Sequence, residues 1–333
     1  MSDRSVRGYL IGMVTARNRS WGRRLAFTLG LVGASLASQM TFADTKTLPH
    51  ITCTNVVEQP EAGSAQAWLA RSMLAGHCYN FQARAVTIDA LGVRTLALSH
   101  RIRDGIRQQV VQHLDGPSIS VERRSMVGYM ARFTPDAASD LDASGAWAQH
   151  VASYYDISFQ EDARVAGREA VQLRFSPHDQ QRYYHVWWVD KETGLLLKHV
   201  MSDSQERVLE TFQMTQLHSP ELYNGNIASD PSAEGLAYPW EVTWLPDGFE
   251  AQPQEPEHAN SHQRIYSDGL ATFSLFVNPV EPPGLSEGVH RLGVSTAAIA
   301  IVSEGGQQWQ LVGVGELPPD MLRRIVQSVH IEP

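Results

Sequence analysis

The sequence predicts an α+β protein with two domains: a larger antiparallel β domain, then a smaller domain in which one helix covers one sheet. Between residues 79 and 217, strand-like segments follow one another with short turns, the pattern of a meander rather than of alternating β-α-β units. Residues 219–239 are rich in Ser, Pro, Asn and Gly and lack apolar periodicity, which predicts a linker. An amphipathic helix follows Pro318-Pro319 near the end of the chain.

The N-terminal segment has the pattern of a secretory signal peptide over residues 1–43. Four arginines between positions 17 and 24 precede an almost wholly apolar or small run at 25–37, and Thr41-Phe42-Ala43 offers small residues for cleavage. An uncleaved membrane anchor is the alternative, but the strongly apolar run is shorter than the roughly 20 residues a spanning helix needs. The start codon could be Met13 rather than Met1. We therefore expect an exported protein.

Charge argues against nucleic acid as a partner. The whole chain has 27 basic and 36 acidic residues, and residues 1–43 hold six arginines and one aspartate. The mature part therefore carries 21 basic and 35 acidic residues, a net charge of −14. Phosphate backbones are bound by clustered Lys and Arg, so a nucleic-acid or polybasic membrane-surface mode is disfavoured.

The chain has two cysteines, Cys53 and Cys78, both in the mature part. In an oxidising compartment such a pair is a disulfide candidate, with two free buried thiols as the alternative. The spacing is not C-x-x-C, which argues against a redox role.

The predicted elements of the first domain begin with a helix capped by Ser64 and ending near Gly76, with Trp68 and Leu69 on its apolar face. Asp104-Gly105 and Asp190 to Gly194 are hairpin signals. A second short helix is predicted over residues 143–155. The predicted strands cover residues 81–88, 94–103, 106–114, 118–124, 126–133, 170–175, 183–189, 195–201 and 207–217.

The predicted second domain starts at Trp240. Pro246-Asp247-Gly248 supplies a turn in which glycine takes the positive-φ position. Phe273, Leu275 and Val277 alternate with smaller or polar side chains, as in a half-buried strand. The strands are expected at residues 241–245, 264–266, 271–278, 294–302 and 309–314.

No motif in the sequence predicts an active site, a metal site or a cofactor. G-x-S-x-G, H-E-x-x-H and Walker sequences do not occur. His258 and His262 are four apart in a Pro-rich stretch without a third ligand, which favours a solvated loop over zinc. Gly313-Val314-Gly315 lacks the last glycine of a dinucleotide fingerprint, so we interpret it as strand and turn geometry. The sequence predicts a binding protein rather than an enzyme.

Aromatic side chains are the most informative feature of the first domain. The segment Tyr183 to Val189 is bulky on both faces, which indicates either packing between two layers or one face turned toward a ligand such as an acyl chain. A packed core is the simpler interpretation, because aromatic stripes are usually core. The lipid-binding candidates are Tyr155, Phe159, Phe175, Tyr184, Trp187, Trp188 and Phe212.

Several segments resemble the MucB/RseB family of periplasmic regulators of an envelope-stress (sigma-E/AlgU-type) sigma factor. In the first domain they are Tyr154-Tyr155-Asp156, Arg164 to Arg168, Arg182-Tyr183 and Trp188 to Lys198. In the second domain they are Trp244-Leu245-Pro246-Asp247-Gly248-Phe249, Tyr266-Ser267-Asp268-Gly269-Leu270-Ala271 and Gly313-Val314-Gly315-Glu316-Leu317-Pro318. The similarity runs in order over most of residues 64–330.

The resemblance implies a fold and a function. Residues 64–218 would form a lipoprotein-carrier-like antiparallel half-barrel with helices on its concave face, and residues 240–330 a small α+β domain behind the 219–239 linker. The protein would act in the periplasm, bind the periplasmic region of a RseA/MucA-like anti-sigma factor and shield it from regulated proteolysis. Lipopolysaccharide, or another mislocalised lipid with an acyl chain, would release it. The sequence leaves a homo-oligomer open as well.

Two other functions fit the sequence less well. A lipid or lipoprotein carrier without a transcriptional partner would need only the first domain. A periplasmic hydrolase would need a nucleophile and base that no motif supplies.

Overall fold

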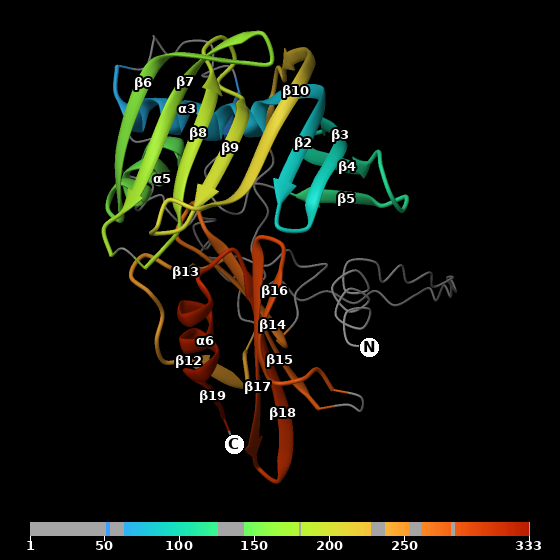
Figure 1. Cartoon of the computed structure of the whole chain (residues 1–333), viewed down its shortest axis with the longest axis vertical. Helices are drawn as coiled ribbons and strands as arrows, with labels where there is room; N and C mark the ends of the chain where they lie inside the picture. Colours follow the sequence, from blue (N-terminus) through green and yellow to red (C-terminus); the bar gives the residue numbers. More distant parts are fainter. Residues whose placement is uncertain are drawn as a thin grey trace, which may run out of the picture. The chain divides into compact units, whose positions relative to one another are not determined.

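Two antiparallel sheets dominate the computed structural model, which describes residues 51–53, 63–125, 143–179, 181–227, 237–252, 261–280 and 284–332 (Figure 1). The predicted signal peptide and the predicted strand at 126–133 lie outside the described residues. Within those ranges, none of the helices has the length and apolar character needed to cross a membrane.

The first domain is a nine-stranded sheet in the order β5-β4-β3-β2-β10-β9-β8-β7-β6, and every neighbouring pair is antiparallel. The predicted meander is therefore confirmed. The meander consists of two consecutive runs, β2 to β5 and β6 to β10. Strand β10 joins them, because it pairs with both β9 and β2. The strands are β2 (Tyr79–Asp89), β3 (Gly92–Arg103), β4 (Ile106–His113), β5 (Ser120–Ser125), β6 (Tyr155–Val165), β7 (Arg168–Pro177), β8 (Tyr184–Asp190), β9 (Leu196–Ser202) and β10 (Val208–Leu222).

Tight turns fall where the sequence places them. Asp104 and Gly105 both have positive φ, 52° and 76°, between β3 and β4, and Gly194 has φ 82° between β8 and β9. The edge strand β6 was not among the predicted strands. Its alternation of Tyr155, Ile157 and Phe159 with polar residues is interrupted after Gln160, where the pairing with β7 shifts register.

Helices α3 (Ala65–Cys78) and α5 (Ala143–Ala152) pack on one face of this sheet (Figure 1). The side chain of Ser64 accepts a hydrogen bond from the backbone N–H of Ala67, which confirms the predicted cap. Trp68 and Leu69 are buried with Trp147 of α5 and apolar residues of β6, β7 and β8. This helix–sheet layer is the core of the first domain.

A disulfide fixes the N-terminal arm to the end of α3. Cys53 and Cys78 are bonded, with an S–S distance of 2.04 Å, and both are fully buried. The arm also pairs as strand β1 (Ile51–Thr52) with β11 (Asn226–Ile227). The predicted disulfide is confirmed, and it links two residues that are 25 positions apart in the sequence.

Strand β10 runs further than expected, into residues assigned to the linker. It ends at Leu222 instead of 217, with Glu221 opposite Asn80 of β2. A register shift between His218 and Glu221, where Ser219 has φ 38°, lets pairing resume past Pro220. The turn-forming residues here make a bulge within a strand rather than the end of one.

The second domain has a six-stranded sheet in the order β13-β14-β15-β18-β17-β16, covered by α6 (Pro319–Gln327). The strand predicted at residues 241–245 is wrong in length: β12 covers Trp240–Val242, and it pairs with β19 (Val329–Ile331). Three strands of this domain, β13, β16 and β19, were not predicted. The sheet contains β13 (Glu250–Ala251), β14 (Gln263–Ser267), β15 (Thr272–Pro279), β16 (Gly288–Leu292), β17 (Ser295–Glu304) and β18 (Gln307–Gly315).

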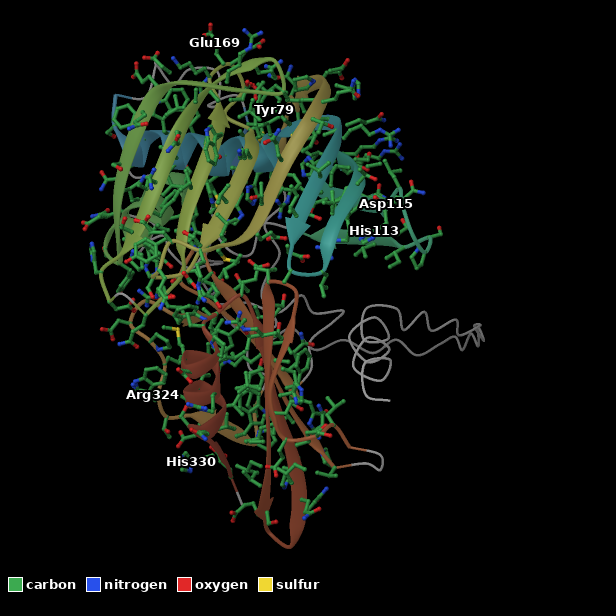
Figure 2. The ribbon with its side chains drawn as sticks, viewed as in Figure 1. Tyr79, His113, Asp115, Glu169, Arg324 and His330 are labelled. Carbon is green, nitrogen blue, oxygen red and sulfur yellow. A yellow bond between two sulfur atoms is a disulfide. The ribbon has the colours of Figure 1, made fainter. Side chains whose placement is uncertain are left out.

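The core of the second domain lies between α6 and the sheet. Phe273, Leu275 and Val277 are buried, as the alternation predicts, and pack in one cluster with Leu322 and Ile325 of α6. Arg324 lies on α6 (Figure 2). Its guanidinium carbon is 3.7 Å from the ring centroid of Trp244, a cation–π contact. The predicted single helix over one sheet is confirmed.

Candidate functional site at the domain junction

A buried ion pair joins the two domains. Arg182, just before β8, is 2% exposed, and Asp268, in the turn between β14 and β15, is fully buried. The Arg182 Nε lies 3.2 Å from the Asp268 Oδ2. Breaking such a pair on one side costs about 3–5 kcal/mol, because it leaves a buried charge without compensation.

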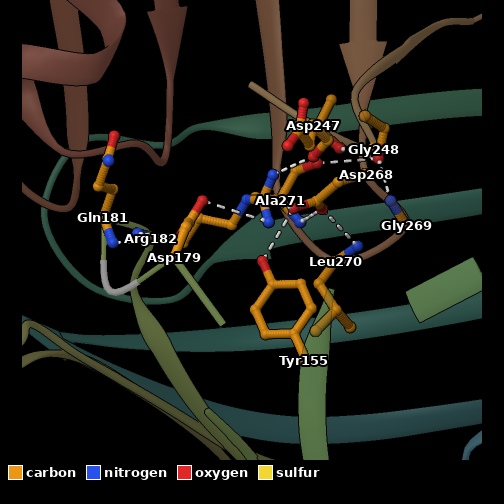
Figure 3. Close-up of polar contacts among 12 residues, drawn as sticks. Tyr155, Asp179, Gln181, Arg182, Asp247, Gly248, Asp268, Gly269, Leu270 and Ala271 are labelled. Atoms are coloured by element: carbon orange, nitrogen blue, oxygen red, sulfur yellow. Dashed lines mark hydrogen bonds and ion pairs between the residues drawn. The ribbon is translucent and has the colours of Figure 1, made fainter. Parts of the chain in front are cut away.

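Asp268 is held by donors from both domains (Figure 3). Its Oδ1 accepts hydrogen bonds from the backbone N–H groups of Leu270 and Ala271 at 3.0 and 2.8 Å, which fix the turn. Its Oδ2 accepts a hydrogen bond from the Tyr155 hydroxyl at 2.9 Å, across 113 residues of sequence. The carboxylate therefore organises its own turn and receives the first domain at the same time.

The Arg182 side chain makes further contacts with both domains. Its Nη2 donates to the carbonyl oxygen of Asp247, and its Nη1 lies 3.4 Å from the Asp179 carboxylate. Rings of Tyr154, Tyr155 and Phe249 have centroids 5.3–5.7 Å from the guanidinium carbon. Aromatic faces stabilise a desolvated cation, so the site suits a permanently charged guanidinium.

Burial sets the protonation of the other two partners. Burial, and then the neighbouring Asp268 carboxylate, raise the pKa of Tyr155 well above its usual value, so the hydroxyl remains a donor. Burial also raises the pKa of Asp268, while Arg182 and the two backbone N–H groups oppose that shift. Arg182 is thus the largest influence that favours the charged form of Asp268.

Two glycines let the second domain approach α5 closely. A Cβ on Gly248 would lie 2.5 Å from the ring of Tyr154, and one on Gly269 would lie 2.7 Å from the Val151 side chain. Both glycines have positive φ, 84° and 98°. The His150 Nε2 donates to the Gly248 carbonyl at 3.0 Å. Any larger residue at either glycine would push the domains apart.

A third contact involves the segment after β18. The Tyr183 hydroxyl donates to the Leu317 carbonyl at 3.4 Å, and the Thr296 hydroxyl donates to the same oxygen at 3.0 Å. Beside it, burial and then the Glu316 carboxylate raise the pKa of Glu210 on β10 to about 7. We call Tyr154, Tyr155, Arg182, Tyr183, Asp247, Gly248, Asp268, Gly269 and Leu317 the domain junction.

Sequence patterns could identify the junction's residues but not its geometry. Every one of its residues falls in a family-like segment, from Tyr154-Tyr155 to the Gly313–Pro318 run. Arg182 and Asp268 were not singled out, because a charged residue in a turn usually faces solvent. One signal could have pointed to them: Arg182 is next to Tyr183, and Asp268 is two residues after Tyr266.

The seven aromatic candidates do not form one site. Tyr155 and Phe175 are 1% and 0% exposed and belong to the packed core under α3 and α5. Phe159 and Trp187 are half-buried on the same helix-covered face. Phe212 of β10 is half-buried opposite His199. Tyr184 and Trp188 alternate with Trp187 along β8 and so face the other side, where Lys198 stacks on Trp188 at 4.6 Å.

Two stacked histidines lie beside Trp187. The His185 Nδ1 and His199 Nε2 are 2.9 Å apart, so one nitrogen donates and the other accepts. Burial lowers the pKa of His185 to about 3 and that of His199 to about 4, so both are neutral near pH 7. No group of three or more potential metal ligands occurs in the part of the chain that the structure describes.

Fold and junction together define a two-domain β-rich protein whose smaller domain docks on the larger one through a buried ion pair. The chain belongs to the MucB/RseB family. The model of the MucB/RseB N-terminal domain matches residues 64–234, and that of the C-terminal domain matches residues 235–330. The boundary between the two matches falls within the linker that the sequence predicts.

Similar proteins are regulators of sigma factors. Sigma factor AlgU regulatory protein MucB of Pseudomonas aeruginosa is 29% identical over 302 residues, 83% of this chain and 94% of that protein. Sigma-E factor regulatory protein RseB of Escherichia coli is 25% identical over 301 residues, 83% of this chain and 92% of that protein.

Solved structures agree over both domains. The Pseudomonas aeruginosa MucA/MucB complex matches with a TM-score of 0.58 and 26% identity, covering 81% of this chain and 99% of that chain. A crystal structure of MucB in complex with MucA(peri) matches equally well.

Proposed function

We propose that this chain is a periplasmic regulator that binds the periplasmic region of a MucA-like anti-sigma factor and protects it from regulated proteolysis. Release would follow when the chain senses lipopolysaccharide or another mislocalised lipid. The observation that carries the proposal is the match over both domains to MucB, which has been crystallised with MucA(peri). A lipid carrier would need only the first domain, whereas in this chain a buried ion pair and hydrogen bonds hold a second domain against the first.

The compartment and the charge fit this role. A buried disulfide is typical of proteins that fold outside the cytoplasm, and it agrees with the predicted signal peptide. The acidic mature chain is poorly suited to DNA, so an effect on transcription would pass through a protein partner.

The helix-covered face is our proposed site for the apolar part of a lipid. Phe159 and Trp187 are half-buried beside the helices, and Phe212 lies on the same side of the sheet, opposite His199. Tyr155 and Phe175 are fully enclosed by core packing. The indole nitrogens of Trp68 and Trp187 are buried without a hydrogen-bond acceptor among the described residues. Buried donors are normally paired, and an ester or amide carbonyl of an acylated ligand would satisfy them. Tyr184 and Trp188 on the opposite face are the weaker candidates.

Lipid and anti-sigma factor would be linked through the domain junction. A ligand that binds the free form better than the complexed form weakens the partner's affinity by the same factor. Because α5 carries both core residues of the helix-covered face and contacts to Gly248 and Gly269, a shift of α5 would reach the second domain directly.

Protease protection tests the first half of the proposal. The purified periplasmic segment of the anti-sigma factor is incubated with the first protease of the cascade, with and without the mature chain. We expect the chain to slow cleavage in a saturable manner. Cleavage at an unchanged rate with excess chain would contradict the protective role.

A pair of adjacent tryptophans tests the lipid half. Lipopolysaccharide is titrated into the preformed complex of wild type, Trp187→Ala or Trp188→Ala, and release of the anti-sigma segment is followed by fluorescence anisotropy. Trp187→Ala should require more lipid for release, and Trp188→Ala, on the opposite face, should behave as wild type. Unchanged partner affinity at saturating lipid would exclude the release mechanism while leaving partner binding intact.

A further inference from the structure

A shallow depression lies on the face of the first sheet that points away from α3. Its volume is about 350 Å³, and strands β2, β3, β4 and β10 line it. Ile102 of β3 packs against Leu74 of α3, so Ser99 and Arg101, which alternate with it, point to the other side of the sheet. The hollow exists because the side chains of Ala97 and Ser99 are small. Longer polar side chains surround it: Gln82, Arg84, Arg101, Gln112 and His218.

The rim offers hydrogen-bond donors and positive charge without any carboxylate. None of the lining residues is acidic. Several other arginines of the described residues are paired, among them Arg94 with Asp89, Arg168 with Asp190 and Arg182 with Asp268. The guanidinium groups of Arg84 and Arg101 have neither an ion pair nor a hydrogen bond among the described residues. In a mature chain of net charge −14, this hollow therefore brings together two cations that are available to an anion.

The register spaces the two arginines for a single ligand group. Arg84 lies opposite Ala97, and Arg101 is four residues further along β3. Four residues of antiparallel strand span roughly 14 Å, so the guanidinium groups can reach the hollow from opposite ends. Arginine binds phosphate oxygens in a bidentate manner, and a phosphate offers oxygens to more than one guanidinium at once.

We propose that this depression binds a phosphate ester, held between Arg84 and Arg101, with the amides of Gln82 and Gln112 available to its polar carrier group. The phosphate could belong to a soluble phosphorylated compound or to the headgroup of an anionic lipid. The site is on the face opposite the helices and stands whether or not the chain binds an anti-sigma factor.

Two probes and three single substitutions test this proposal with the mature, disulfide-bonded chain. Binding of glucose 6-phosphate is measured by calorimetry. Binding to phosphatidylglycerol vesicles is measured by flotation, with phosphatidylcholine vesicles as the uncharged comparison. The variants are Arg84→Gln and Arg101→Gln. The matched control is Arg174→Gln, an exposed arginine of β7 on the same outer face, because its neighbour Leu173 lies in the core under α3 and α5.

The proposal expects saturable binding that Arg84→Gln and Arg101→Gln each weaken about tenfold or more, the loss expected when a charge-assisted contact is removed. Arg174→Gln should bind as wild type does. Binding to both probes identifies the phosphate ester as sufficient, and binding to the vesicles alone identifies a lipid headgroup as the source. The proposal is overturned if neither probe binds, or if Arg174→Gln weakens binding as much as the two rim variants. Melting temperatures of all three variants establish that they fold.

Discussion

The buried ion pair at the domain junction gives a quantitative prediction. Asp268→Asn retains the acceptor for the backbone N–H groups of Leu270 and Ala271 but removes the charge that faces Arg182. Arg182→Met retains the side-chain length but leaves the carboxylate buried. Removing one partner of a buried pair costs about 3–5 kcal/mol. We expect Asp268→Asn to lower the free energy of unfolding by about 3 kcal/mol, at the lower end of this range. The reason is that the Asp179 carboxylate and the Asp247 carbonyl still face the Arg182 guanidinium.

The double variant separates pairing from packing. With neither charge present, Arg182→Met/Asp268→Asn should cost much less than the two single changes together, with a coupling of about 2–3 kcal/mol. The free energy of unfolding is measured by urea denaturation with tryptophan fluorescence. An exposed ion pair of the second domain, Arg323 with Asp320 at 2.8 Å, is the control, and Arg323→Met should cost less than about 1 kcal/mol. Additivity of the two junction substitutions within about 0.5 kcal/mol would refute a direct interaction between Arg182 and Asp268.

Three further predictions concern stability. The cysteines of the Cys53–Cys78 disulfide are 25 positions apart, and reducing the bond should lower the free energy of unfolding by about 3.5 kcal/mol. Urea denaturation with and without reductant measures this loss. An unchanged urea midpoint would contradict a stabilising role for the disulfide. Because the pKa values of His185 and His199 are lowered to about 3 and about 4, stability should be complete above pH 6.5 and fall as the pH drops toward 4. The His185→Gln/His199→Gln variant should show a shallower fall in thermal unfolding scans, and an identical slope would count against the buried pair. The Glu210 pKa is raised to about 7, so its ionisation should destabilise the folded state as pH rises from about 4.5 through 7; Glu210→Gln should remove that loss, and no difference at pH 8 would refute it.

The sequence predicts most strands because their side chains alternate locally. Phe273, Leu275 and Val277 are buried as that alternation requires, and Gly194 has the positive φ its hairpin needs. The same reasoning missed β6, since the polar run after Phe159 interrupts the period just where the strand bulges. It also ended β10 too early, because Ser219-Pro220 is a turn signal that here forms a bulge.

The junction and the aromatic faces could not be derived in that way. Tyr155 and Asp268 meet across 113 residues, and no local pattern encodes the register that brings them together. Trp187 and Trp188 are adjacent and equally bulky, so alternation separates their faces without saying which one the helices cover. Only packing against α3 and α5 decides this, and it assigns Trp187 to the covered side.

Affinity for the anti-sigma factor tests the proposed function most directly. The mature chain is titrated by calorimetry with the periplasmic segment of the MucA-like protein encoded in the same genome, at physiological salt. We expect a saturable complex with a Kd of about 10 μM or tighter, equivalent to about −7 kcal/mol or more of binding free energy. The absence of heat and of a co-eluting complex at about tenfold higher concentrations would contradict regulation through this partner.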